Sequence, residues 1–282
     1  MVPGAGVLSI MELREHGGRG KGDDRMDEVI EPVGSAETKG TTGEFETDGV
    51  TRATGAAGAS LRISGTHFPV RTLGPGRRFA VWLQGCALAC PGCMSRHTWD
   101  PLGGSDRPVP SLLALWRAAL AAGADGLTVS GGEPLDQPAG LGALLTGAAG
   151  IRDEALAAGS AAADLLLYTG YEGEEIDRNP LRTAAVRPVD ALVTGRFRIA
   201  EPTALVWRGS ANQRLRPRTE LGRARYAAHL DRTDEGPRLQ THLAEGENDV
   251  RLYGVPLRGE LAALERRLAR AGIRLDRRSW RP

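Results

Sequence analysis

Short apolar runs alternate with helical patterns along the chain from residue 79 onward. Ser111 is a candidate N-cap of a helix that Gly123 ends, and the Ala/Leu-rich stretch 140–158 predicts a second helix. The apolar runs between these helices contain no charged side chain, as is typical of strands buried on both faces of a parallel sheet. This alternation predicts an α/β domain with right-handed crossovers. The four expected strands are 79–83, 127–129, 165–168 and 191–193.

Three motifs each follow one of the first three expected strands. A run of cysteines begins at Cys86, Gly-Gly-Glu occupies 131–133, and Thr-Gly occupies 169–170. Because the carboxyl ends of parallel strands meet at one rim, we expect these motifs to lie together there. The pattern predicts a partial (open) parallel β/α barrel with one ligand site on that rim.

The regions on either side of this core differ from it in composition. Residues 1–60 are rich in Gly, Glu, Asp and Thr without a sustained apolar period, which predicts a disordered tail. The core is expected to span 61–245. Residues 246–282 are predicted to form an extension, with a strand at 250–253 and an amphipathic helix beyond it.

Composition narrows the classes of function. The chain has 282 residues, 41% of them apolar, and a formal charge of +1, and no apolar run is long enough to span a membrane. The first 30 residues lack the apolar segment of a secretory signal, so we expect a cytoplasmic protein. The near-neutral charge predicts no nucleic-acid partner and no membrane partner. The only lysines, Lys21 and Lys39, lie in the tail, which disfavours Schiff-base chemistry.

All three cysteines lie within eight positions, as Cys86, Cys90 and Cys93. A disulfide framework favours an even number of cysteines and a secretory context. Zinc prefers four ligands, usually as two separated pairs, whereas a [4Fe-4S] cube held by three cysteines keeps one iron open for a substrate or cofactor. The spacing favours one [4Fe-4S] cluster, with a zinc site and structural cysteines as alternatives.

Further motifs accompany the cysteines. They are Gly74-Pro75-Gly76-Arg77, Gly85-Cys86, Cys90-Pro91-Gly92-Cys93, Thr98-Trp99, Ser130-Gly131-Gly132-Glu133-Pro134-Leu135, Tyr168-Thr169-Gly170-Tyr171 and Arg208-Gly209-Ser210-Ala211-Asn212-Gln213-Arg214. Together they resemble the radical S-adenosylmethionine (SAM) superfamily, and within it the activating proteins of anaerobic ribonucleoside-triphosphate reductase and pyruvate formate-lyase. The cysteine spacing carries the superfamily resemblance, and the last two motifs narrow it.

The resemblance implies a mechanism and a set of site residues. The three cysteines would ligate three irons, SAM would chelate the fourth, and reductive cleavage of SAM would give a 5′-deoxyadenosyl radical. Gly131 and Gly132 would let the backbone approach the methionine part of SAM, and Glu133 would accept a hydrogen bond from its ammonium group. A plain strand-to-helix turn is the alternative for this motif. The other residues implied at the SAM site are Gly92, Thr169, Gly170, Arg208, Asn212 and Gln213, with a surface turn as the alternative for the last three.

Three functions remain open at this point. The first is an activase that generates a glycyl radical on a large partner enzyme and receives electrons from a flavodoxin or ferredoxin. The second is a radical SAM enzyme acting on a small molecule or peptide in a biosynthetic pathway. The third is a non-catalytic metal-binding docking module. Gly-Gly-Glu in place of the family's common Gly-Gly-Asp, and Ser95-Arg96-His97 in place of its usual Asn, leave the partner open.

Overall fold

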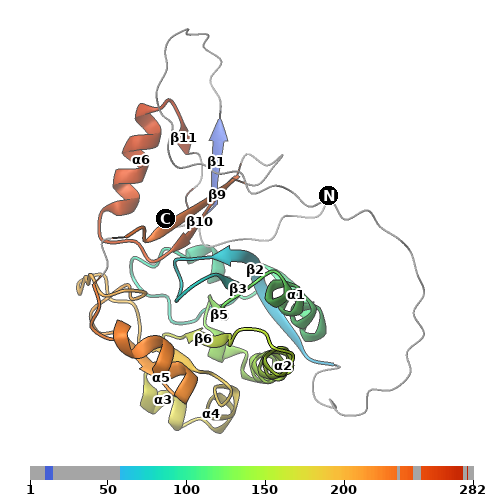
Figure 1. The fold of residues 1–282 in the computed structure, drawn as a ribbon. Helices are drawn as coiled ribbons and strands as arrows, with labels where there is room; N and C mark the ends of the chain where they lie inside the picture. The colour runs from blue at the N-terminus through green and yellow to red at the C-terminus, as the bar shows by residue number, and fades with distance from the viewer. Residues whose placement is uncertain (1–9, 15–57, 234–235, 244–248, 276–277, 279–282) are drawn as a thin grey trace, which may run out of the picture.

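The computed structural model describes residues 10–14, 58–233, 236–243, 249–275 and 278, and in this part of the chain the strands form two sheets (Figure 1). In the larger sheet, four central strands are mutually parallel and antiparallel strands flank them. The order is β4 (Ser105–Pro108), β2 (Ser60–Val70), β3 (Arg78–Leu83), β5 (Gly126–Gly131), β6 (Asp164–Tyr168), β7 (Ala191–Thr194) and β8 (Arg214–Pro217).

Two helices cover one face of this sheet, α1 (Val109–Ala121) and α2 (Pro138–Ala157) (Figure 1). Alternate residues of the central strands, such as Val81 and Val129, point toward these helices and form the main apolar core. Trp116 of α1 is fully buried, and its Nε1 donates to the carbonyl of Ala148 in α2 at 3.1 Å. The shorter helices are α3 (Gly173–Asp177), α4 (Pro180–Ala185) and α5 (Glu220–Tyr226).

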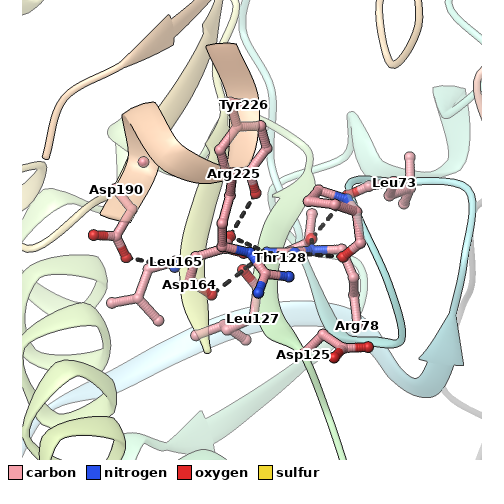
Figure 2. A network of polar contacts seen from close by, with 12 residues as sticks. Leu73, Arg78, Asp125, Leu127, Thr128, Asp164, Leu165, Asp190, Arg225 and Tyr226 are labelled. Carbon is pink, nitrogen blue, oxygen red and sulfur yellow. Dashed lines mark hydrogen bonds and ion pairs between the residues drawn. The ribbon is translucent and has the colours of Figure 1, made fainter. Parts of the chain in front are cut away.

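A buried ion-pair network lies on the opposite face of the sheet, near the amino-terminal ends of its strands (Figure 2). The fully buried side chains of Arg78 and Asp164 begin β3 and β6, and Nη2 of the arginine lies 2.7 Å from Oδ1 of the aspartate. Nε of Arg225 lies 2.6 Å from the other carboxylate oxygen, and the hydroxyl of Tyr226 also donates to Asp164. Nε of Arg78 donates to Oγ1 of Thr128 at 2.5 Å. One carboxylate thereby joins β3, β6 and α5.

The smaller sheet carries the C-terminal unit, which we define as β9 (Leu239–Leu243), β10 (Asp249–Gly254) and α6 (Glu260–Arg270). The strand order is β11 (Arg274–Leu275), β1 (Ile10–Arg14), β10 and β9, all antiparallel. The ring of Tyr253 stacks on Trp82 of the larger sheet, with centroids 5.2 Å apart, and on His67 at 4.5 Å. Oγ1 of Thr72 donates to the carbonyl of Tyr253 at 3.0 Å. These contacts fix the C-terminal unit against β2 and β3.

The structure places strands at all four predicted apolar runs and at 250–253, and helices at both predicted helical stretches. Helix α1 starts at Val109 instead of after Ser111, because Pro110 suits the first turn and the Ser111 hydroxyl donates back to the carbonyl of Pro108. Residues 10–14 form β1, although this segment falls in the stretch that we expected to be disordered; the rest of 1–57 lies outside the described residues. A search of the described helices finds none with the length and hydropathy of a membrane span.

The histidine at the sheet contact gives the fold a pH dependence. Burial, with His242 of β9 and the charge of Arg251 of β10, lowers the pKa of His67 to about 4. The unfolded chain therefore binds a proton between pH 6.5 and 4 that the folded chain does not, so stability falls as the pH falls through this window. We expect His67→Phe, which keeps a flat ring beside Tyr253, to reduce this loss. Urea unfolding at pH 7 and pH 4.5 measures it; equal pH dependence of parent and variant would contradict the assignment.

Candidate iron–sulfur site

The cysteine loop leaves the carboxyl end of β3 and is closed at its base by backbone hydrogen bonds. The amide of Gly85 donates to the carbonyl of Thr98 at 2.8 Å, and the amide of Cys86 donates to the carbonyl of Trp99 at 3.1 Å. Left-handed backbone at Ala89, with φ of 45°, and at Gly92, with φ of 77°, turns the chain back on itself between the cysteines. The loop is thus a compact turn of defined shape.

The three thiols of this loop are half-buried and free of disulfides. Burial raises the pKa of Cys86 to about 11 and also raises the pKa of Cys93. A neighbouring thiol raises each pKa further: Cys93 acts in this way on Cys86, and Cys90 on Cys93. Among the described residues, no three His, Cys, Asp or Glu side chains are gathered as ligands of a single metal ion. Ligands of a cubane bind separate irons and need not meet at one point. Three soft, neighbouring sulfur donors therefore fit a cluster.

The Gly-Gly-Glu turn packs directly against the start of the cysteine loop. The amide of Gly132 donates to the carbonyl of Leu83 at 2.7 Å, and the amide of Glu133 donates to the carbonyl of Gly85 at 2.8 Å. A β-carbon on Gly132 would lie 2.2 Å from the oxygen of Gly85, and Gly131 has φ of 103°. The glycines are thus required by contact with the protein's own backbone, because any side chain would push the two segments apart.

Glu133 joins this turn to the end of the next strand. Its side chain is 1% exposed and accepts hydrogen bonds from the amide of Leu135 at 2.9 Å, the hydroxyl of Thr169 at 2.7 Å and the amide of Gly170 at 2.7 Å. Burial raises the pKa of Glu133 to about 7, against the lowering effect of these three donors. The carboxylate therefore ties the carboxyl ends of β5 and β6 together.

The Thr-Gly motif after β6 also contacts the cysteine loop. A β-carbon on Gly170 would lie 2.4 Å from Cδ1 of Leu88, which lies between Cys86 and Cys90. The cysteine loop, the Gly-Gly-Glu turn and the Thr-Gly turn therefore meet at one rim of the sheet, as the order of strands and motifs along the chain predicts.

The polar residues after β7 bind backbone groups. The guanidinium of Arg208, 4% exposed, donates to the carbonyls of residues 206, 229 and 230. Nδ2 of Asn212 donates to the carbonyl of Arg196 at 2.9 Å, and Nε2 of Gln213 donates to the carbonyl of Gly195 at 3.0 Å. These side chains shape the segment that follows β7.

A cavity of about 390 Å³ lies beside Cys93 on the face of the sheet opposite α1 and α2. Three of the sequence-predicted residues line it: Gly92, Cys93 and Gln213. The others do not line it: Cys86, Cys90, Gly131, Gly132, Glu133, Thr169, Gly170, Arg208 and Asn212. Sequence reasoning missed its aromatic wall, Phe197 and Trp207, which no motif marks. Sequence reasoning also missed the part of the lining that comes from residues 254–261, because these residues reach the cavity only through the docking of the C-terminal unit.

Comparison with known proteins agrees with this site. The family described as "4Fe-4S single cluster domain" matches residues 72–216, which include all three cysteines. The chain is 30% identical over 147 residues to the anaerobic ribonucleoside-triphosphate reductase-activating protein of Enterobacteria phage T4, covering 52% of this chain and 88% of that protein. It is 32% identical over 144 residues to the protein of that name from Pasteurella multocida, covering 50% and 87%. It is 30% identical over 155 residues to the Escherichia coli K12 protein of the same name, covering 52% of this chain and 93% of that protein.

The matched domain and the cysteine loop define an iron–sulfur protein with a single-cluster domain. The chain belongs to the family of the anaerobic ribonucleoside-triphosphate reductase-activating proteins. These comparisons confirm the expected resemblance to this family and the expectation of an iron–sulfur cofactor. The matched relatives account for about half of this chain, and the family match ends before the C-terminal unit.

Proposed function

We propose that this protein is a radical SAM enzyme that generates a glycyl radical on a partner reductase. The observation that carries the proposal is the meeting of the cysteine loop, Glu133 and Gly170 at one rim beside a cavity of about 390 Å³. That volume is within the range of sites for small cofactors. The family membership supports the choice of a reductase as partner, and the electron donor would be a flavodoxin or ferredoxin.

The residues of this chain would have separate tasks in that reaction. Cys86, Cys90 and Cys93 would hold three irons of a [4Fe-4S] cluster and leave the fourth for the amino and carboxylate groups of SAM. Such a cluster, once bound and reduced, would supply the one electron needed for reductive cleavage of SAM, and the radical chemistry that follows would remove a hydrogen atom from a glycine of the partner. The apolar walls of the cavity would exclude water from this step.

The proposal is tested on protein reconstituted with iron and sulfide without oxygen. Dithionite and SAM are expected to yield 5′-deoxyadenosine and methionine, and addition of the large reductase subunit from the same organism is expected to yield a glycine-centred signal in electron paramagnetic resonance. Deoxyadenosine without a glycyl radical would favour the small-molecule or peptide enzyme instead. A bound cluster without SAM cleavage would favour the docking module.

Glu133→Gln provides a second test that separates cofactor binding from cluster assembly. We expect the dissociation constant of SAM to rise about tenfold, because a carboxamide carries no charge to attract the ammonium group, while the iron content stays that of the parent. The free energy of unfolding should also fall by about 1–3 kcal/mol, because the new NH₂ group replaces one of the two acceptor oxygens, so a backbone amide that donated to that oxygen loses its acceptor. Equilibrium dialysis, iron analysis and urea unfolding measure these three quantities.

The matched control for this test is Glu174→Gln. The Glu174 side chain is 82% exposed in an i,i+4 ion pair, so its replacement should change none of the three quantities measurably. If Glu133→Gln lowers stability but leaves SAM affinity unchanged, Glu133 serves only to join β5 and β6.

A further inference from the structure

The cavity beside Cys93 is bounded by two parts of the chain, one inside the region that matches the iron–sulfur family and one outside it. One side belongs to the matched iron–sulfur domain and includes Cys93, Tyr168 and Trp207. The other side is the segment from Val255 to Leu261, which leads from β10 into α6 and lies beyond the family match at 72–216. The cavity therefore exists in this form only because the C-terminal unit lies against the domain.

Tyr168 lines the cavity and carries a hydroxyl group without a hydrogen-bond partner among the described residues. The hydroxyl oxygen itself is closed off from solvent, so a ligand reaches it only when the cavity wall around it shifts. Buried hydroxyl groups nearly always have a partner, and a phenol can both donate and accept. A ligand with a polar edge turned toward β6 would provide that partner.

The segment at the start of α6 forms a positioned apolar wall. The amide of Leu257 donates to Oε2 of Glu260 at 2.7 Å, and the amide of Glu260 donates back to the carbonyl of Leu257 at 3.1 Å, so the turn is closed. Leu257 remains 41% exposed and lines the cavity together with Val255 and Leu261. An exposed leucine at a cavity wall gains apolar contact when a ligand covers it.

Another part of the lining is aromatic. Phe197 and Trp207 line the cavity, and the ring of Trp207 is held by Tyr226, at 5.8 Å between centroids, and by His229, at 4.7 Å. A space lined by both aromatic rings and aliphatic side chains suits a flat heteroaromatic ring, because nucleobases stack on aromatic side chains and tolerate apolar cover.

We propose that the C-terminal unit completes the cofactor site of this protein. Val255, Leu257 and Leu261 cover the nucleoside part of SAM, and the hydroxyl of Tyr168 forms a hydrogen bond with its polar edge. This inference rests on the proposed function, since it assigns SAM to the cavity. It adds that a unit outside the matched domain contributes to SAM affinity, and that Tyr168 is a binding residue as well as part of the sheet.

The test uses the full chain, reconstituted with its cluster, and SAM as the probe. Hydrogen exchange read by mass spectrometry is expected to slow at the backbone amides of residues 255 and 257–261 when SAM is added. Leu257→Ser is expected to raise the dissociation constant of SAM about tenfold in equilibrium dialysis. The matched control is Leu181→Ser on α4. Leu181 is also an exposed leucine, 64% accessible, but it does not line the cavity, so this variant should bind SAM like the parent.

Tyr168→Phe separates a binding role from a structural one. Removing a hydroxyl that lacks a protein partner should leave the melting temperature of the SAM-free protein unchanged or higher, while the dissociation constant of SAM rises about fivefold. A role in the sheet alone would leave SAM affinity unchanged.

The outcomes distinguish this inference from the function on which it rests. Slowed exchange at 255–261 with weaker binding by Leu257→Ser supports it. If the parent binds SAM but exchange at 255–261 is unchanged and Leu257→Ser binds like the parent, the inference is wrong and the proposed function stands. If the reconstituted parent does not bind SAM, the proposed function fails, and this inference fails with it.

Discussion

Replacing Cys86, Cys90 or Cys93 singly by alanine is expected to abolish formation of 5′-deoxyadenosine and to remove most of the bound iron. Each thiolate would supply one of only three protein bonds to the cluster, and no other cysteine exists in the chain to replace it. Iron and sulfide analysis after anaerobic reconstitution, with chromatographic measurement of 5′-deoxyadenosine, checks both effects.

A suitable control for the cysteine variants is Ala87→Ser, because Ala87 is an exposed residue of the same loop and carries no thiol. This variant should retain its cluster and its activity, which shows that the loop tolerates substitution. A cysteine variant that assembles a normal cluster and cleaves SAM at the parental rate would remove that cysteine from the ligand set.

Asp164→Ala is expected to lower the free energy of unfolding by about 3–5 kcal/mol, the cost typical of breaking a buried ion pair. The Asp164 carboxylate is fully buried between the guanidinium groups of Arg78, at 2.7 Å, and Arg225, at 2.6 Å (Figure 2). Removing it leaves the Arg78 charge buried without its counter-ion. Urea unfolding of the parent and the variant at pH 7 measures the difference.

The matched control for this prediction is Asp106→Ala. Asp106 also forms an ion pair with an arginine, Arg62, at 2.7 Å, but its side chain is 62% exposed. Water and salt screen such a pair, so its loss should cost less than about 1 kcal/mol. Similar losses for the two variants would show that the buried pair contributes no more than a surface pair.

The two ends of the central strands have different tasks. Arg78 and Asp164 lie where β3 and β6 begin, whereas Gly85 and Thr169 follow the ends of the same strands. The ion-pair network therefore holds the strands together at one end, and the candidate site occupies the other. For this reason Asp164→Ala should affect stability without removing any proposed cluster ligand.

Antiparallel strands were the main feature of the fold that the sequence pattern did not reveal. Strands β4, β8 and β9 contain charged, polar or proline residues, since β4 and β8 end the larger sheet and β9 ends the smaller one. Exposed sheet edges tolerate such residues, so no continuous apolar run marks these three strands. Strand β2 lies between β4 and β3, and polar residues also interrupt its apolar positions. The central parallel strands are buried on both faces, and their apolar runs mark them clearly.

For the candidate site, the sequence alone determined the three sulfur donors and their order after the strands. Spacing along a loop and position after a buried strand are local properties, and the parallel sheet turns them into a common rim. Only the tertiary structure decided that Gly132 packs on Gly85, that Glu133 reaches Gly170, and that Leu257 of the C-terminal unit lines a cavity beside Cys93. These contacts join residues far apart in the chain, and they depend on how side chains fill space between elements, which no local pattern of residues encodes.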